Sequence, residues 1–224
     1  MKYFESFPSI LYTFDKNTEN LQSVTNIFAR SAFLRDIKGN VDVSYEYLVK
    51  DSDTPESIAF KEYGDAYRSW ILLLFNNIMN PNYDWPLKSD SLDDYIEAKY
   101  GQSVDEAKNT INHYEKVVTN TQYSNGMIVY REVKKTEIGE YDINFSNNTI
   151  TPNTLPTVPD TSLTITEETV NYTDYILNVL TEIRAVSNYQ TEFNANEEKR
   201  KIRILAPSYI QRVETEFREL MRNG

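Results

Sequence analysis

The fold is decided by residues 47–59, which read YLVKDSDTPESIA. Aromatic and β-branched side chains occupy every second position from Val43 to Val49, which is the period of a strand with one buried face. Thr54 is suited to cap a helix, because its hydroxyl can accept a hydrogen bond from an unpaired backbone N–H. Pro55 fits the first helical position, where its missing N–H costs nothing. The stretch therefore predicts a strand followed at once by a short helix.

A second helix is predicted directly behind the first. Gly64 can adopt the left-handed conformation that ends a helix, and Asp65 can cap the next one, which runs to about Asn76. This second helix is apolar over more than half its circumference, so we expect it to be buried on several sides. Its apolar residues are Trp70, Ile71, Leu73, Leu74 and Phe75. With an extended aromatic segment expected at residues 83–87, residues 41–90 have the order strand, helix, helix, extended segment.

Residues 91–123 are predicted to be helical. One helix is expected to begin at Ser91 and to end at Gly101. Apolar residues at spacings of three and four predict another helix over residues 104–118.

Residues 124–166 are interpreted as an inserted β-hairpin with a loop. Residues 127–133 and 138–145 have the pattern of two hairpin strands, while residues 146–160 are rich in Asn, Thr and Pro, which favours a loop. Residues 163–165 could form a further strand.

Residues 167–224 are predicted to contain helices and one short strand. A helix is expected over residues 172–186 and a strand over residues 201–205. An apolar stripe over residues 210–221 predicts a terminal helix. Most such stripes pack in the protein's own core, although a stripe at a chain terminus can also dock on a partner.

Residues 1–40 hold two apolar patches. Pro8 argues against a regular helix through the first patch, and the second is spaced for a short amphipathic helix that Gly39 could end. The segment is either a flank packed on its own domain or an arm that ties onto a neighbouring chain. The first patch comprises Phe4, Phe7, Ile10, Leu11 and Tyr12, and the second Val24, Ile27, Phe28, Ala32 and Leu34.

Composition limits the classes of function. The 224 residues suffice for one or two domains, and their 17 Tyr, 10 Phe and 2 Trp supply the apolar area of a real core. The 23 basic and 34 acidic residues give a net charge of −11, which repels nucleic acid and anionic lipid. The only basic cluster, residues 198–203, is interrupted by other residue types. No apolar run approaches the ~20 residues of a membrane span. Because the N-terminus also lacks a signal-peptide pattern, we expect a soluble protein made in the cytoplasm.

The sequence contains no recognisable catalytic, cofactor-binding or metal-binding motif. It has no Cys and a single histidine, His113, and it lacks a Gly-rich phosphate loop and a nucleophile elbow. Adjacent carboxylates such as Asp93 and Asp94 would point about 100° apart on a helix and would not converge on a substrate. A long-range carboxylate pair of a cell-wall hydrolase is left open. Tyr83 and Trp85 could stack on sugars, but a packing role is favoured.

The decisive stretch resembles a LysM module. That family has a strand, a Gly-Asp-Thr turn, Ile-Ala on a first helix, a Tyr-Gly stop and a second helix that ends near Asn. Here Asp53-Thr54, Ile58-Ala59 and Tyr63-Gly64 match the pattern, whereas Ser52 replaces the usual Gly and Pro55 stands where Leu is typical. These departures concern glycan binding more than the fold.

Several blocks in the right order resemble a more specific family, the baseplate wedge protein of T4-type contractile-tailed phages with a LysM-like fold. Residues 124–166 are not covered by this resemblance. The matching blocks are residues 3–8, 10–12, 53–59, 70–78, 83–87 and 196–205.

The resemblance implies a structural subunit and not an enzyme. We expect an α+β fold: a small LysM-like strand-helix-helix-strand module with additional helices, a β-hairpin insertion and extended N- and C-terminal segments. The subunit would clamp the core of a wedge and join neighbouring wedges around the hub and tube of a sixfold virion baseplate. Its partners would be other wedge proteins, neighbouring wedge copies and hub or tail-tube proteins. The alternatives are a peptidoglycan-binding LysM-type module and, less favoured, a cell-wall hydrolase.

Fourteen apolar, aromatic or basic side chains are candidates for partner contacts. They are Tyr3, Phe4, Phe7, Ile10, Leu11, Tyr12, Tyr83, Trp85, Arg200, Ile202, Ile204, Tyr209, Phe217 and Leu220.

Overall fold

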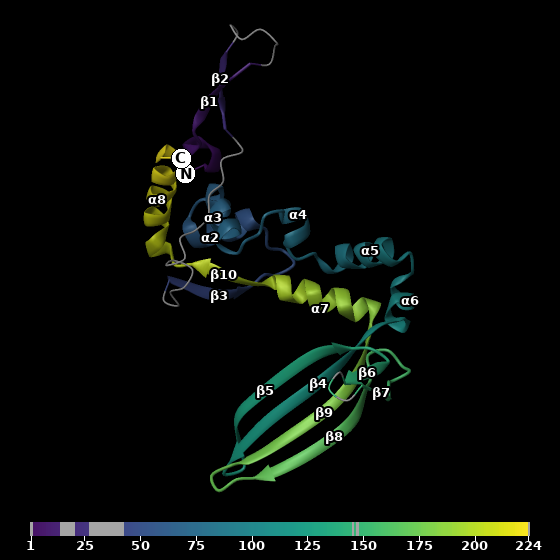
Figure 1. The fold of residues 1–224 in the computed structure, drawn as a ribbon. Helices are drawn as coiled ribbons and strands as arrows, with labels where there is room; N and C mark the ends of the chain where they lie inside the picture. Colours follow the sequence, from purple (N-terminus) through teal and green to yellow (C-terminus); the bar gives the residue numbers. More distant parts are fainter. Residues whose placement is uncertain (1, 14–20, 27–42, 145, 147, 224) are drawn as a thin grey trace. The chain divides into compact units, whose positions relative to one another are not determined.

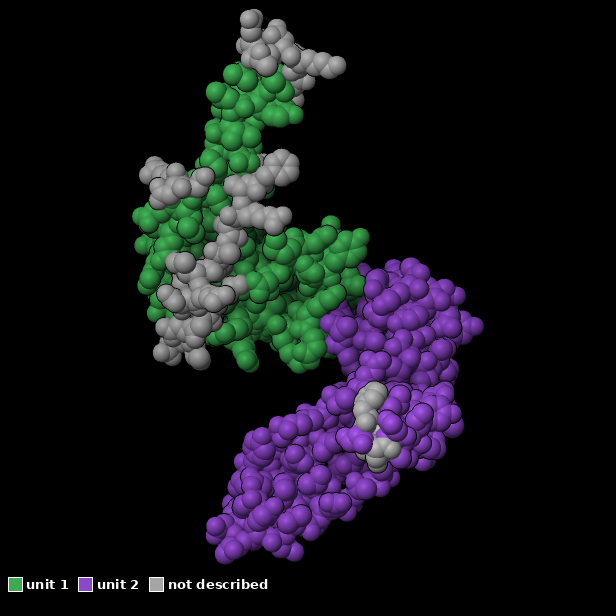
Figure 2. Space-filling model, viewed as in Figure 1, with its two compact units in different colours: residues 1–88, 197–224 green, residues 89–196 purple. Residues whose placement is uncertain are grey.

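The computed structural model has the expected α+β fold class (Figure 1). It describes residues 2–13, 21–26, 43–144, 146 and 148–223. The chain forms two compact units, which Figure 2 shows in different colours. Unit 1 comprises residues 1–88 and 197–224, and unit 2 comprises residues 89–196, so unit 2 is an insertion between two segments of unit 1.

Unit 1 contains a two-stranded antiparallel sheet whose strands come from distant parts of the sequence. β3 (Ser44–Leu48) pairs with β10 (Lys201–Leu205), which places Tyr47 opposite Ile202 and Tyr45 opposite Ile204. Both predicted strands are therefore present, and each is the other's partner.

The helices of unit 1 begin and end at the predicted caps. Thr54 Oγ1 accepts the Ser57 N–H at 3.2 Å at the start of α2 (Pro55–Tyr63), and Gly64 follows with a φ of 71°. Asp65 accepts the Tyr67 N–H at 2.9 Å. It thereby caps a 3-10 turn, η3 (Ala66–Arg68), that leads into α3 (Ser69–Phe75).

The prediction of an extended segment over residues 83–87 was wrong for its first two residues. Tyr83 lies in the short helix α4 (Pro81–Asp84), which Asn80 caps by accepting the Asn82 N–H at 3.2 Å. The Asn80-Pro81 pair is a helix start, because Asn is a good N-cap and Pro fits the first helical position.

The core of unit 1 joins both ends of the described chain. The terminal helix α8 (Ile210–Asn223) follows a 3-10 turn, η4 (Pro207–Tyr209), and buries its apolar stripe inside the unit. The ring of Phe217 lies 4.6 Å from that of Trp70 in α3 and 5.3 Å from that of Tyr3 in η1 (Tyr3–Ser6). The stripe on α8 is thus covered by its own chain. Its buried members are Ile210, Val213, Phe217 and Met221.

The N-terminal segment continues as a hairpin of β1 (Ser9–Tyr12) and β2 (Gln22–Thr25). All four residues of β1 are exposed. Most of the helix expected between Val24 and Leu34 lies outside the described residues, while Val24 itself belongs to β2.

Unit 2 combines short helices with a long antiparallel sheet. Its four-stranded sheet has the order β5-β4-β9-β8, and a separate hairpin pairs β6 with β7. The helices are α5 (Ser89–Tyr100), α6 (Val104–Asn109) and the first part of α7 (Asn188–Arg200), whose last residues belong to unit 1. The strands are β4 (Ile111–Ser124), β5 (Met127–Ile138), β6 (Tyr141–Asn144), β7 (Thr149–Pro152), β8 (Ser162–Asn171) and β9 (Ile176–Ser187).

Glu192 holds the helices of unit 2 together. Its Oε1 accepts hydrogen bonds from Lys99 Nζ at 2.6 Å and from the Tyr100 hydroxyl at 2.8 Å, both on α5. The carboxylate is buried, and its bond to Lys99 raises the pKa of that ammonium group. This charge-assisted bond, between a buried carboxylate on α7 and a half-exposed ammonium group on α5, links the two helices.

Two helices expected in this region are strands. Residues 111–118 belong to β4 and residues 176–186 to β9, so the predicted helices over 104–118 and 172–186 were wrong in those parts. Val117, Thr119 and Thr121 are buried in alternation, which is the period of a strand. Their β-branched side chains favour the strand over the helix that the i, i+3 and i+4 apolar spacing also permits.

The expected hairpin pairing was also wrong. Residues 127–138 form one strand that pairs with β4 across a tight turn at Asn125 and Gly126, whose φ values are 52° and 77°. An Asn-Gly pair with two positive φ angles is the preferred two-residue hairpin turn. Residues 141–144 pair instead with residues 149–152, inside the segment that was expected to be a loop. The strand expected at residues 163–165 is confirmed as part of β8.

Candidate interaction surfaces

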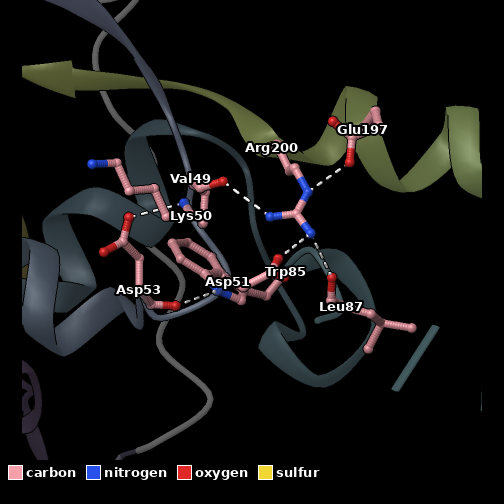
Figure 3. A network of polar contacts seen from close by, with 8 residues as sticks. All are labelled: Val49, Lys50, Asp51, Asp53, Trp85, Leu87, Glu197 and Arg200. Carbon is pink, nitrogen blue, oxygen red and sulfur yellow. Dashed lines mark hydrogen bonds and ion pairs between the residues drawn. The ribbon is translucent and has the colours of Figure 1, made fainter. Parts of the chain in front are cut away.

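Arg200 is the centre of a polar network in unit 1 (Figure 3). Its Nε donates to Glu197 Oε1 at 2.7 Å, and its Nη2 donates to Asp51 Oδ1 at 2.5 Å. The same guanidinium reaches two backbone carbonyls, those of Val49 at 3.1 Å and Leu87 at 3.0 Å. Burial by itself disfavours the charge, but the bonds to Asp51 and Glu197 outweigh it and raise the pKa of Arg200. This side chain is committed to contacts within its own unit.

The Arg200 network lies where the chain leaves unit 1 and where it returns to unit 1 after unit 2. Leu87 lies next to the last residue of the first segment, and Glu197 is the first residue of the second. Lys199 Nζ adds a bond to the Tyr83 carbonyl at 2.7 Å. The stretch before the insertion is therefore fastened to the stretch after it by two basic side chains.

Trp85 and Tyr83 have different environments. Trp85 is half-buried against the core of unit 1, and its indole N–H donates to the Asp53 carbonyl at 3.4 Å. Tyr83 is 72% exposed. The packing role favoured for both rings therefore fits Trp85 but not Tyr83, whose ring lies at the surface of the chain.

The candidate contact residues fall into three groups by burial. Phe7, Arg200, Ile202, Ile204 and Phe217 are buried within unit 1. Tyr3, Trp85 and Tyr209 are half-buried and pack against the same core. The remaining six have exposed side chains: Phe4, Ile10, Leu11, Tyr12, Tyr83 and Leu220.

Most of the exposed apolar surface of unit 2 was not anticipated from the sequence. Every residue of β8 is exposed, although half-buried or buried residues would be expected in a sheet with a covered face. The tip of the β4–β5 hairpin carries four exposed apolar residues in a row. The exposed apolar residues on these strands and the adjoining turn are Met127, Ile128, Val129, Tyr130, Val133, Leu163, Ile165, Val170, Tyr172 and Ile176.

A groove of about 400 Å³ lies on the sheet of unit 1. The side chains of Leu48 and Lys201 face each other across the two strands there, as do those of Glu46 and Arg203. This outer face carries an exposed Leu48 with basic side chains beside it, which suits a protein contact more than a small apolar ligand.

Within the described residues no three His, Cys, Asp or Glu side chains are grouped to hold a metal ion. His113 lies on β4, where its Nε2 is 3.6 Å from Glu115 Oε1. No helix among the described residues has the length and apolar character needed to cross a membrane.

The fold and its surfaces define an α+β protein that exposes apolar side chains on the strands of unit 2. The family model described as Base plate wedge protein 53 matches residues 2–222. The chain belongs to this family, and it is therefore a structural component of the phage tail baseplate. The match also runs through residues 124–166, where no resemblance had been found. A search of the curated proteins returned no match.

Proposed function

We propose that the chain clamps the core of a baseplate wedge and joins neighbouring wedges around the hub and tube. The observation that carries this proposal is the long sheet of unit 2, whose edge strands expose apolar side chains. Sixfold repetition, contacts with hub or tail-tube proteins and assembly in the host cytoplasm belong to the same proposal.

The sheet is poorly covered by its own unit. Its buried apolar residues lie toward the end of the sheet next to α6 and α7: Val117, Ile183, Ala185 and Val186. Toward the opposite end, Ile128, Val170 and Ile176 are exposed. Sheets with a hydrophobic face normally pack it against a second layer, so a partner protein is the natural cover for this end.

Unit 1 supports a LysM-like module as the rigid base of the subunit. β3, α2, α3 and β10 follow the order strand, helix, helix, strand, and the two strands are antiparallel neighbours. In this interpretation the second strand of the module is β10, which follows unit 2 in the sequence. The buried terminal residues then serve the module, while exposed residues such as Leu11 and Tyr12 remain candidates for partner contacts.

The proposal is tested by co-expressing the chain with the other wedge proteins. We expect Ile165→Asp and Val170→Asp, each at an exposed position of β8, to reduce incorporation into the wedge. Val158→Asp is the matched control, because Val158 is 57% exposed in unit 2 but lies outside the sheet. A wedge that assembles normally without the chain, or that takes up both β8 variants as well as the wild type, would contradict the proposal.

The alternative function, peptidoglycan binding, is favoured by one observation, the exposed ring of Tyr83 beside the LysM-like elements. Incubation with purified cell walls separates the alternatives. Binding that disappears in Tyr83→Ala, while Tyr67→Ala at another exposed ring binds normally, would support a glycan site. An absence of binding would leave the assembly role as the only supported function.

A further inference from the structure

The four-stranded sheet of unit 2 has two open edges. β5 and β8 are its outer strands, and among the described residues each pairs with a single neighbour. Because neighbouring strands alternate in direction, β8 runs antiparallel to β5. A second copy placed beside the first in the same orientation would therefore present its β5 to this β8 as an antiparallel neighbour.

The two edges differ in charge. β8 carries Glu167 and Glu168 and contains no basic residue, whereas β5 carries Arg131, Lys134 and Lys135 together with two glutamates. Two copies of β8 facing each other would oppose like charges, and this disfavours a symmetric β8–β8 contact. Opposite-charge pairing instead favours β8 of one copy against β5 of another.

The strand register places the charges on matching faces. Glu167 is connected across the sheet through Leu180 and Thr119 to Val133, which shares a face with Lys135. Glu168 is connected in the same way through Val179 and Asn120 to Glu132, which shares the other face with Lys134. In an antiparallel pair the residue numbers of the two strands run in opposite directions. A register with Glu168 opposite Lys134 therefore also places Glu167 opposite Lys135, and the two members of each pair lie on the same face of the sheet.

We propose that β8 of one copy pairs with β5 of a second copy of this chain, with Glu168 opposite Lys134 and Glu167 opposite Lys135. The contact is head-to-tail, so each copy uses both edges and the sheet continues from one subunit to the next. This inference rests on the assembly role proposed above and adds to it a direct contact between copies.

The contacts that these groups make within one chain do not prevent the pairing. Lys134 Nζ lies 3.4 Å from Glu132, and Lys135 Nζ lies 3.3 Å from Glu115, with both lysine side chains at least half exposed. Glu167 accepts a hydrogen bond from the Asn178 side chain at 3.3 Å. The lysine end of each pair is exposed to solvent, which weakens the pair, so the lysines can exchange these contacts for contacts between copies.

Disulfide trapping tests the contact directly, because the chain contains no Cys. Chains with Glu168→Cys and chains with Lys134→Cys are co-expressed with the other wedge proteins, and assembled particles are oxidised. Directly opposite strand residues lie within the Cα separation that a disulfide spans. We expect a covalent dimer from the mixture and much less from Glu168→Cys alone or from Val158→Cys mixed with Lys134→Cys.

Charge reversal tests the same pairing without a cross-link. Lys134→Glu with Lys135→Glu in one chain should weaken association between copies on the order of tenfold, because two opposite-charge pairs become like-charge pairs. A chain that also carries Glu167→Lys and Glu168→Lys should recover it, since every pair is again of opposite sign.

The outcomes separate this inference from the proposed function. If the wild-type chain enters the wedge but the cysteine mixture yields no more dimer than its controls, the contact between copies is refuted and the assembly role stands. If the wild-type chain does not enter the wedge at all, both are refuted. A specific dimer together with recovery by the fully reversed chain establishes the contact.

Discussion

The side-chain amide of Asn76, at the end of α3, pairs with the backbone of Arg203 in β10. Asn76 Nδ2 donates to the Arg203 carbonyl at 2.8 Å, and Asn76 Oδ1 accepts the Arg203 N–H at 2.8 Å. The amide thus takes the place that a further strand would occupy at this point of β10. It closes one edge of the small sheet and fixes the helix to the strand.

Removing this amide should destabilise unit 1. Asn76→Ala leaves the Arg203 N–H and C=O without their partners, and we expect it to lower the free energy of unfolding by about 1–3 kcal/mol. Urea unfolding followed by circular dichroism measures the change. Asn82→Ala on the exposed side of α4 is the control and should change stability by less than about 0.5 kcal/mol. Equal effects of the two substitutions would show that the Asn76 amide does not stabilise the sheet.

The Arg200 network predicts a larger loss. Arg200→Ala removes the partner of Asp51 and Glu197 and leaves the carbonyls of Val49 and Leu87 without their donor. The Asp51 and Glu197 side chains are 51% and 38% exposed, so water can solvate them when Arg200 is removed. The expected loss is set by the two unpaired carbonyls, at about 1–3 kcal/mol each. Thermal and urea unfolding should both report it.

Lys201→Ala provides the comparison for Arg200. Lys201 Nζ forms an exposed ion pair with Glu198 at 2.5 Å, and exposed pairs contribute about 0–1 kcal/mol. A loss for Arg200→Ala no greater than that for Lys201→Ala would contradict the interpretation of Arg200 as the fastener of the two chain segments.

The local parts of unit 1 could be predicted because their signals are local. Thr54, Pro55 and Gly64 determine where α2 begins and ends through contacts within a few residues. The pairing of β3 with β10 has no such signal, since the two strands are separated by the whole of unit 2. Which side chains of α8 are buried also depends on contacts that are distant in the sequence. Phe217 is 4% exposed and Leu220 49%, and only the packing of the helix on the core decides which of the two is available to a partner.

Unit 2 could not be predicted well because the edge strands of its sheet, β5 and β8, are exposed on both faces over almost their whole length. β8 has no buried residue, so it lacks the strict apolar alternation by which strands are recognised. In β4 the apolar residues Ile111, Tyr114 and Val118 also fit helical spacing, and the turn at Asn125 and Gly126 was the signal that should have taken precedence.

Trp70 offers a test of the core that joins the two ends of the chain. Trp70 is buried between Tyr3 and Phe217, with ring centroids 5.5 Å and 4.6 Å away. Trp70→Ala should therefore cost about 3–5 kcal/mol in the free energy of unfolding. Leu220→Ala on the exposed side of α8 should cost far less. A loss below about 1 kcal/mol for Trp70→Ala would mean that the core lies elsewhere.

Tyr47 predicts a specific dependence of stability on alkaline pH. Burial, and then its hydrogen bond to Asp53 at 2.9 Å, raise the pKa of Tyr47 from 10.0 to about 12. Because the folded protein holds this proton more tightly than the unfolded chain, the contribution of Tyr47 to stability is complete below pH 10.0 and is lost as the pH rises to about 12.

Urea unfolding at a series of pH values should show that Tyr47→Phe loses less stability over this interval than the wild type. Asp53→Asn should make this loss smaller and complete at a lower pH, because without the negative charge the pKa of Tyr47 in the folded protein lies closer to its unfolded value. Identical alkaline slopes for the wild type and Tyr47→Phe would show that the Tyr47 hydroxyl is not held by Asp53 in the folded protein.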